Sequence, residues 1–246
     1  MALIKPPRGV VEIVERLVGS GHEAWCVGGG VRDALLGVPG LDWDVATAAT
    51  PAEVQRLFRR TVPVGVEFGT VGVFDREGRM HEVTTFRRDV RTDGRHAVVE
   101  FGATLDDDLA RRDFTINAIA YSPTRDALRD PFGGRDDLAR RVVRAVGVAA
   151  DRMREDRLRA LRAIRFAARF GFEIDAETWA AIVAGAPEMA RLSPERVRQE
   201  LAKTMEQVAR PSAALARWRA SGALAVLAPG IAGVPDAHVA ALDRLP

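Results

Sequence analysis

The spacing of apolar residues along the chain changes near residue 147. Before that point, short apolar or alternating runs are typical of strands, and apolar residues three and four positions apart are typical of helices. The polar segment 87–96 interrupts the strands, and we expect it to form a mobile loop. The pattern predicts helices over 10–19 and 50–59, and strands over 24–27, 62–73, 80–86 and 98–101.

After residue 147 the strand pattern stops and apolar residues recur at helical spacing. A domain boundary is therefore expected near this residue. The predicted helices cover 152–170, 176–184, 194–208 and 212–227.

One stretch joins a glycine turn to a pair of carboxylates. The glycines at 28–30 follow a short apolar run and lead into a helical stretch, whose first backbone N–H groups suit phosphate oxygens. Asp42 and Asp44 are two positions apart in an expected strand, so their side chains would project from the same face. Two carboxylates on one face suit Mg²⁺, which takes oxygen ligands from protein and phosphates together. The stretch therefore predicts a site for phosphate groups and their metal ions.

Each feature alone has a simpler explanation. A glycine turn is usually a tight connection, and an Asp-x-Asp pair is usually a solvated part of a loop. Their occurrence together, with Arg32 and Asp33 between them, favours the functional interpretation. Gly30, Asp33 and Trp43 are interpreted as scaffold. The three acids at 106–108 are interpreted as complementing a helix dipole and not as a metal cluster.

Composition limits the class of protein. The chain has 246 residues, of which 47% are hydrophobic, so we expect a globular fold with a sizeable core. It has no run of about eighteen apolar residues and no apolar signal-peptide core at its beginning, so we expect a soluble, cytoplasmic protein. The single cysteine, Cys26, excludes an internal disulfide and a cysteine-based zinc site. Its place in an apolar run predicts a small core residue.

Arginine dominates the basic residues. Net charge is only +2, but 34 of the 36 basic residues are arginine, because Lys5 and Lys203 are the only lysines. The planar guanidinium matches phosphates and base edges, although genomic composition also explains part of such a bias. The placement of the arginines is more informative. Arg111, Arg112 and Asp113 come directly before an apolar run.

A second candidate site lies on the helix expected over 152–170. Asp156, Arg159, Arg162 and Arg165 recur at every third position, so we expect them along one side of that helix. The simpler interpretation is a solvated charged face. The alternative is base recognition, because Asp accepts hydrogen bonds and Arg only donates them. An Asp–Arg pair held in one plane fits the pairing edges of cytosine and adenine, and would leave uracil or guanine facing like groups.

Six motifs occur in order between about residue 22 and residue 227. They are GGGVRDALLG (28–37), Asp42-x-Asp44, RRDFTINAIA (111–120), DPFGG (130–134), EDRLRALRAIRFAARFGF (155–172) and SPERVRQEL (193–201). Together they resemble class II tRNA nucleotidyltransferases, which are the CCA-adding enzymes and their poly(A) polymerase relatives in the polymerase-β superfamily.

The resemblance implies an α+β fold. A polymerase-β-like nucleotidyltransferase head with a mixed sheet would cover residues 1–147. An all-helical neck with a base-reading helix would cover 148–210, and the start of a helical body would cover 211–246. Members of the family usually run well beyond 246 residues, so the resemblance implies either a truncated chain or a short natural form. In the family, the body and tail grip the tRNA elbow.

The resemblance also implies roles for residues of the head. Asp42 and Asp44 would bind two Mg²⁺ ions, and Glu82 matches the place of a third acidic residue. Gly29 and Arg32 would contact the triphosphate of the incoming nucleotide.

Further residues would bind the nucleotide. The resemblance implies that Arg112 and Asp113 hold its phosphate or ribose. Asp156 and Arg159 would read the base. Two arginines would support that site, namely Arg162 and Arg165.

The activity implied by the resemblance is the addition of C and A to tRNA 3′ ends from CTP and ATP. Protein side chains would select the base, and Mg²⁺ would be the cofactor. One metal ion would lower the pKa of the tRNA 3′-hydroxyl, and the other would neutralise the triphosphate and the leaving pyrophosphate. The expected partner is tRNA, and neither a membrane nor an obligate protein partner is expected. Arginines of the neck would grip the RNA backbone, which makes binding salt-dependent.

Other products stay open at this point. An A-adding or CC-adding tRNA nucleotidyltransferase and a poly(A) polymerase share the head motifs. Residues 61–73 lack the basic stretch that we associate with bacterial poly(A) polymerases, which favours a tRNA enzyme. Residues 87–96 match the flexible loop with which the family changes from C to A, and argue against a CC-only enzyme. A more remote alternative is a catalytically inert RNA-binding module.

Overall fold

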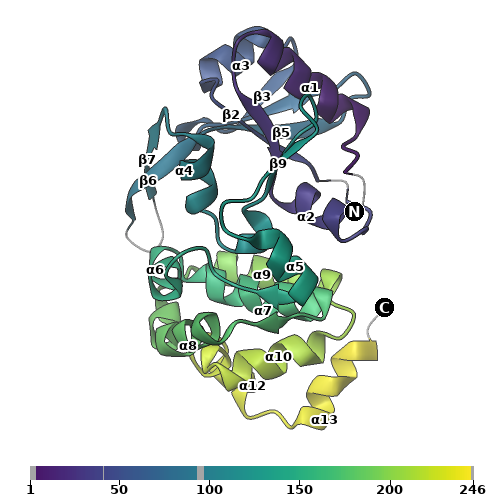
Figure 1. Cartoon of the computed structure of the whole chain (residues 1–246). Coiled ribbons are helices and arrows are strands. Elements are labelled where there is room, and N and C mark those ends of the chain that lie inside the picture. Colours follow the sequence, from purple (N-terminus) through teal and green to yellow (C-terminus); the bar gives the residue numbers. More distant parts are fainter. Residues whose placement is uncertain (1–3, 41, 93–96, 245–246) are drawn as a thin grey trace. The chain divides into compact units, whose positions relative to one another are not determined.

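A computed structural model describes residues 4–40, 42–92 and 97–244 (Figure 1). These residues form two compact units. The first contains the residues up to 91 together with 97–136, and the second contains those from 137 onward. The first unit combines strands and helices, whereas the second is mainly helical, so the predicted α+β class is confirmed.

The first unit is built on a seven-stranded sheet with the strand order β3-β4-β5-β2-β1-β8-β9. Neighbouring strands are antiparallel except for β2 and β5, which are parallel, so the sheet is mixed as expected. The strands are β1 (Ala24–Val27), β2 (Asp44–Thr47), β3 (Thr61–Gly65), β4 (Thr70–Phe74), β5 (Met80–Thr85), β8 (Ala120–Ser122) and β9 (Ala127–Arg129).

Helices α1 (Arg8–Gly19) and α3 (Pro51–Leu57) cover one face of this sheet (Figure 1). The apolar positions of α1 are buried, as their helical spacing predicts. Helix α3, which the sequence predicts, begins with a capping box, in which the Thr50 hydroxyl accepts a bond from Glu53 N and the Glu53 carboxylate accepts one from Thr50 N. A cap of this kind stabilises a helix by about 1 kcal/mol.

Strand β5 alternates between the two faces of the sheet. His81 and Val83 are buried, whereas Met80 and Glu82 are exposed. Because successive side chains point to opposite faces, Glu82 lies on the face opposite the buried valine. Two further helices complete the unit, α2 (Gly29–Leu35) and α4 (Leu105–Ala110).

The prediction of a mobile loop over residues 87–96 is wrong for residues 87–92. These residues form strand β6 (Arg87–Thr92), which pairs with β7 (Ala97–Phe101) in a two-stranded sheet. An ion pair of 2.9 Å joins Arg88 to Glu100 across the two strands. Residues 87–92 are mostly polar and lack the alternation typical of a strand, so their sequence gave no strand signal. Residues 93–96 lie outside the described part of the chain.

Helix α5 (Gly134–Arg140) joins the two units in sequence. The short parallel strands of the second unit are β10 (Val142–Val143) and β11 (Glu173–Ile174). Its helices are α6 (Ala149–Glu155), α7 (Leu158–Phe170), α8 (Ala176–Gly185), α9 (Pro194–Gln207), α10 (Pro211–Ala220), α11 (Ala223–Leu227), α12 (Pro229–Ala232) and α13 (Asp236–Val239).

Two expected helices are each broken in two. The helix predicted over 152–170 is interrupted at Asp156, whose backbone is extended and whose side chain accepts a bond from Leu158 N. The helix predicted over 212–227 is interrupted at Gly222, which has a left-handed φ of 85°. The first helix ends at Asp156 because the side chain bonds to the backbone, and the second ends at Gly222 because glycine adopts the left-handed conformation.

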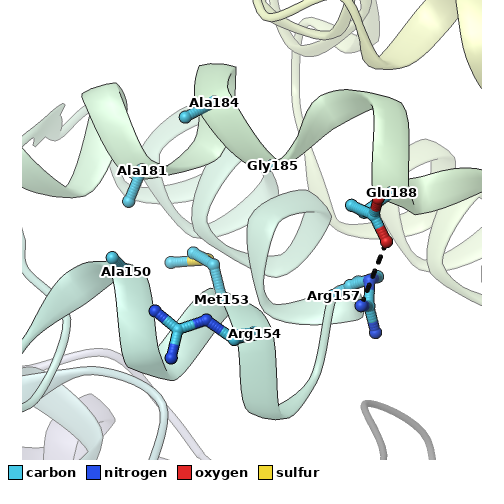
Figure 2. A pocket seen from close by; sticks show the side chains of 8 residues that line it. All are labelled: Ala150, Met153, Arg154, Arg157, Ala181, Ala184, Gly185 and Glu188. Atoms are coloured by element: carbon cyan, nitrogen blue, oxygen red, sulfur yellow. Dashed lines mark hydrogen bonds and ion pairs between the residues drawn. The ribbon is translucent and has the colours of Figure 1, made fainter.

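Helix α6 packs on α8 and leaves a hollow of about 350 Å³ between them (Figure 2). Small side chains, including Ala150, Ala181 and Ala184, line this space together with Met153. An ion pair of 3.3 Å between Arg157 and Glu188 lies at one side of the hollow (Figure 2).

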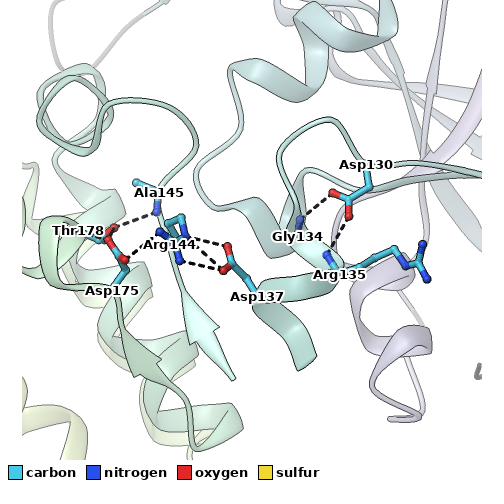
Figure 3. Close-up of polar contacts among 8 residues, drawn as sticks. All are labelled: Asp130, Gly134, Arg135, Asp137, Arg144, Ala145, Asp175 and Thr178. Carbon is cyan, nitrogen blue, oxygen red and sulfur yellow. Dashed lines mark hydrogen bonds and ion pairs between the residues drawn. The ribbon is translucent and has the colours of Figure 1, made fainter. Parts of the chain in front are cut away.

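Residues just before 147 are tied to the helical unit. Arg144 forms ion pairs of 3.1 Å with both Asp137 and Asp175 (Figure 3). The next residue, Ala145, donates its backbone N–H to Thr178 Oγ1 at 3.0 Å (Figure 3). The second compact unit therefore begins at Asp137, and the domain boundaries at residues 147 and 210 stay predictions.

Cys26 is 0% exposed in the middle of β1, and burial raises the pKa of its thiol to about 12. The thiolate that nucleophilic chemistry requires is therefore disfavoured, and the prediction of a small core residue is confirmed. No helix among the described residues combines the length and the apolar character needed to cross a membrane.

Candidate active site

The glycine turn connects β1 to α2 and lies against two charged side chains. Gly28 has a left-handed φ of 72°, a conformation that L side chains rarely adopt. A Cβ placed on Gly28 would lie 3.0 Å from Arg112 Nη1 and 3.6 Å from Asp44 Oδ2. The missing side chain therefore allows Arg112 and Asp44 to approach the same point, a packing role that the sequence did not reveal.

Gly30 and Trp43 hold the carboxylate segment in place. A Cβ on Gly30 would lie 2.7 Å from the Trp43 ring and 3.0 Å from the backbone oxygen of Asp42. Trp43 is buried and its Nε1 donates a bond of 3.3 Å to Gly40 O. This close contact fixes the residue between the two acids, in agreement with the scaffold role expected for Gly30 and Trp43.

Asp44 begins strand β2, and its neighbours on both sides are set by the sheet register. Val27 of β1 is its antiparallel partner. On the other side, Val45 pairs with Val83 in the parallel β5, so Asp44 lies beside Glu82. The parallel pairing of β2 and β5 thus brings together two acids that are 38 positions apart in the sequence.

Three carboxylates lie close enough to influence one another. Burial, together with the charges of Asp42 and Glu82, raises the pKa of Asp44 to about 7, although Arg112 opposes the shift. Like charges that repel one another are stabilised by a bound cation. Asp42 precedes β2, so the expected strand does not contain both acids. The metal-binding role of Asp42, Asp44 and Glu82 stays a prediction.

The donor set fits a divalent ion that is shared with a substrate. In the described parts of the chain, no three side chains of His, Cys, Asp or Glu converge as a closed metal site. An open pair of carboxylates is nevertheless what Mg²⁺ uses when substrate phosphates and waters supply the other ligands. The oxygen chemistry and the repulsion at Asp44 both fit such an ion.

Arg112 is held beside the carboxylates by helix α4. Its Nη2 donates a bond of 3.1 Å to Asp108 Oδ2, and its Nη1 lies 3.5 Å from Asn117 O. The acids at 106–108 form no metal cluster here. Thr104 and Asp107 make a capping box, Asp106 pairs with Arg129, and Asp108 binds arginines.

Asn117 is a residue that the sequence analysis missed. Its Nδ2 donates to Asp113 Oδ1 at 2.9 Å, and its Oδ1 accepts a bond of 2.6 Å from Arg32 Nη1. A side-chain amide both donates and accepts hydrogen bonds, so Asn117 connects the Asp113 carboxylate to the Arg32 guanidinium. Its position inside the motif at 111–120 was the available signal.

Arg32 and Asp113 are both buried in this network. Arg32 Nε donates a bond of 2.8 Å to Asp33, in addition to the bond to Asn117. Asp113 accepts a bond of 2.8 Å from Phe114 N. These contacts show a structural role for each residue, and their contact with a nucleotide stays a prediction.

The prediction that Asp156 shares one side of a helix with Arg159, Arg162 and Arg165 is wrong. Asp156 lies between α6 and α7, and the three arginines lie on α7. Its Oδ1 accepts a bond of 3.0 Å from Leu158 N, and its Oδ2 accepts one of 2.9 Å from Arg196 Nη2 on α9. Both oxygens of the carboxylate are thus oriented by the protein. Sequence spacing gave no sign of Arg196, which is 40 positions away.

Arg159 is fixed by the end of α6. Its Nη1 donates a bond of 2.7 Å to Glu155 and another of 3.2 Å to the backbone oxygen of Arg152. Asp156 lies in the break between α6 and α7, and Arg159 lies in the first turn of α7. Different side chains hold the two residues in place.

The other two arginines of the stripe pack within the helical unit. Arg162 lies over the Phe166 ring at 5.4 Å. Arg165 is 4% exposed, and it donates bonds of 2.6 Å to Glu200 and 2.9 Å to Gln207. Arg165 thus connects α7 to α9, which is a structural function.

The hollow between α6 and α8 contains none of the residues that the sequence singled out. Its lining is mainly apolar, and its Arg157 is paired with Glu188. The carboxylates of Asp44 in β2 and Glu82 in β5, with the neighbouring Asp42, have the oxygen chemistry expected of a metal and phosphate site. We therefore take this group as the candidate active site.

Known families match the chain on both sides of residue 147. Residues 24–144 match the model described as "Poly A polymerase head domain". Residues 171–233 match the model described as "Probable RNA and SrmB- binding site of polymerase A".

Curated relatives are CCA-adding enzymes. That of Geobacillus kaustophilus (strain HTA426) is 46% identical over 205 residues, which cover 82% of this chain and 50% of the relative. That of Lactiplantibacillus plantarum is 46% identical over 198 residues, which cover 78% of this chain and 47% of the relative. The chain spans about half the length of the curated relatives it matches.

Solved structures give the same match. The Bacillus stearothermophilus CCA-adding enzyme in complex with CTP has a TM-score of 0.87 at 42% identity, covering 97% of this chain and 58% of that chain. The Thermotoga maritima CCA-adding enzyme complexed with tRNA-CCA has a TM-score of 0.74 at 30% identity, covering 89% of this chain and 51% of that chain.

Proposed function

Because the chain belongs to the nucleotidyltransferase family of CCA-adding enzymes and poly(A) polymerases, we propose that it adds C and A to tRNA 3′ ends from CTP and ATP. The observation that carries the proposal is the group of Asp42, Asp44 and Glu82 beside Arg112. The relatives that share 44–46% of the sequence are named CCA-adding enzymes, which favours tRNA over a poly(A) product. A role on tRNA agrees with the cytoplasmic location expected from the sequence.

Asp42 and Asp44 would hold Mg²⁺, and Glu82 would complete the acidic surface around them. Mg²⁺ bound there would lower the pKa of the attacking 3′-hydroxyl and neutralise charge on the triphosphate. Arg112 carries a positive charge next to Asp44 and would bind phosphate oxygens. Gly29 and Arg32 would contact the triphosphate, and Asp113 the nucleotide, as the family resemblance implies.

We propose that Asp156 and Arg159 read the base. The carboxylate of Asp156 is oriented by Leu158 N and Arg196, so it can accept a hydrogen bond from an amino group in a fixed direction. Arg159 is oriented by Glu155 and can donate to a ring nitrogen or carbonyl. Arg162 and Arg165 would support this pair by packing α7.

Product length tests the proposal against its rivals. Purified protein and Mg²⁺ are incubated with tRNA that ends before CCA, with tRNA that ends before the final A, and with a generic RNA. Each NTP is supplied alone and in pairs, and the products are sized. We expect three added nucleotides on the first tRNA when CTP and ATP are both present.

Each rival gives a different product. Two added C residues without A would indicate a CC-adding enzyme, and extension only of the tRNA that ends before A would indicate an A-adding enzyme. A long A tract on generic RNA would indicate a poly(A) polymerase. No Mg²⁺-dependent incorporation on any RNA would contradict the proposed enzyme and favour an inert RNA-binding module.

A further inference from the structure

Asp108 of α4 is a fully buried carboxylate with two arginine partners. It is 0% exposed, and its Oδ1 accepts bonds of 3.0 and 2.7 Å from Arg111 Nε and Nη2. Its Oδ2 accepts the bond of 3.1 Å from Arg112 Nη2. Burial alone would raise the pKa of Asp108, but the two guanidinium groups outweigh it and lower the pKa, so the carboxylate is charged.

Arg112 lies near Asp44 without bonding to it. The position of a Cβ on Gly28 is 3.0 Å from Arg112 Nη1 and 3.6 Å from Asp44 Oδ2, so both groups border the same small space. Arg112 is close enough to oppose the raised pKa of Asp44. Within the described residues, however, the ion pair of Arg112 is made with Asp108 and none is made with Asp44.

A guanidinium released next to Asp44 would pair with it, because a paired arginine and carboxylate form strong, directed hydrogen bonds. Such a pair would occupy carboxylate oxygens that a divalent cation needs. Asp108 of α4 offers a competing carboxylate to Arg112, which follows the end of this helix. The location of Asp108 away from water makes that competition effective, since charge interactions strengthen where water is excluded.

We propose that Asp108 is a positioning residue that holds Arg112 beside Asp44 and keeps Asp44 open for a divalent cation. The inference rests on the proposed function, because it assigns the cation to Asp42 and Asp44. It goes beyond that function by giving a role to a residue that touches neither nucleotide nor metal. A purely structural Asp108 would stabilise α4 and leave cation binding unchanged.

The test measures Mn²⁺ binding to the nucleotide-free protein by electron paramagnetic resonance, together with thermal unfolding. Asp108→Asn keeps the shape of the side chain and removes its charge. We expect this variant to bind Mn²⁺ about tenfold more weakly, as Arg112 turns to Asp44. In a protein that also carries Arg112→Met, the same substitution should change Mn²⁺ binding less than about twofold, since no guanidinium is left to block the site.

Two further variants control the measurement. Asp106→Asn lies on the same helix but alters an exposed pair with Arg129, and it should leave Mn²⁺ binding unchanged. If Asp108→Asn alone does not fold, it is combined with Arg111→Met, which removes one positive charge with the negative one. Arg112 still lacks its carboxylate in that protein, and the weakened Mn²⁺ binding should persist.

Three results would overturn the proposal: wild-type protein that binds no Mn²⁺, a folded Asp108→Asn protein with wild-type Mn²⁺ affinity, or equal weakening with and without Arg112→Met. The last would mean that Asp108 acts on the site through the helix and not through Arg112. Failure of nucleotide transfer by a wild-type protein that binds Mn²⁺ would contradict the proposed function alone. The two claims therefore fail on different readouts.

Discussion

Asp44 and Glu82 lie side by side because the parallel strands β2 and β5 pair Val45 with Val83. The register of the sheet thus concentrates negative charge at one point. Burial and the neighbouring charges raise the pKa of Asp44 to about 7, which shows that ionising this residue in the folded protein costs free energy. A site of this kind is stabilised by the cation that it binds.

Asp44→Asn should stabilise the metal-free protein at pH 8. The folded protein holds a proton on Asp44 that the unfolded chain releases near its ordinary pKa of 3.8, so stability falls as pH rises from about 4 through 7. Asparagine removes this cost, and we expect a gain of about 4 kcal/mol at pH 8 and almost none at pH 4. Urea unfolding followed by tryptophan fluorescence measures both values. Equal stability of the two proteins at pH 8 would contradict the assignment.

Gly28→Ala and Gly37→Ala separate backbone strain from crowding. Both glycines have a left-handed φ, of 72° and 69°. Alanine at either position should cost about 1 kcal/mol of stability. A Cβ at Gly28 would also displace Arg112, whereas one at Gly37 meets no atom within 4 Å.

Nucleotide transfer should therefore fall by about tenfold in Gly28→Ala and stay near wild type in Gly37→Ala. Steady-state assays on tRNA, with chemical unfolding of both proteins, provide the comparison. Similar activity losses at the two positions would show that strain, and not the position of Arg112, is responsible.

Arg165→Met should destabilise the helical unit without changing base preference. The substitution leaves Glu200, which is 2% exposed, without its buried partner, and such a loss costs about 3–5 kcal/mol. Arg162→Met, which removes a half-buried guanidinium from the Phe166 ring, should cost less than Arg165→Met. Thermal unfolding measures the stability, and competition between CTP, ATP, UTP and GTP measures preference. A changed preference in a stable Arg165→Met protein would place Arg165 in the base site.

Asp156→Asn and Arg159→Ala should relax selection against UTP and GTP. Asparagine can donate a hydrogen bond where aspartate only accepts, so groups that were mismatched become tolerated. Arg196→Met should have the same effect in weaker form, because it frees Asp156 Oδ2. Arg191→Met, which alters an exposed pair with Glu188, is the matched control. Unchanged misincorporation in all of these variants would remove the base-reading proposal.

The sequence predicted those helices that depend on interactions between residues a few positions apart. The Thr50–Glu53 capping box and the buried stripe of α1 depend on residues within a few positions, and both are present. Strand β6 was missed because residues 87–92 are mostly polar and lack the alternation typical of a strand. The break at Asp156 was missed because spacing alone cannot tell a helical position from a side chain that bonds its own backbone.

Partners that are distant in sequence could not be predicted from spacing. Arg165 reads as one member of a charged stripe, yet its partner Glu200 comes 35 positions later on another helix. Asp108 was interpreted as complementing the helix dipole, which accounts for its place in α4 but not for its burial between two arginine partners. The candidate carboxylates were found because their own spacing carries the chemical signal.

The role of Asp44 in nucleotide transfer is tested most directly by comparing wild-type and Asp44→Asn proteins on tRNA that ends before CCA, with CTP, ATP and Mg²⁺. The wild-type protein should add three nucleotides. Asp44→Asn should remain folded and transfer at least about a thousandfold more slowly, since it loses a charged metal ligand. Equal transfer rates in the two proteins would contradict the central claim that the carboxylates at β2 and β5 carry the reaction.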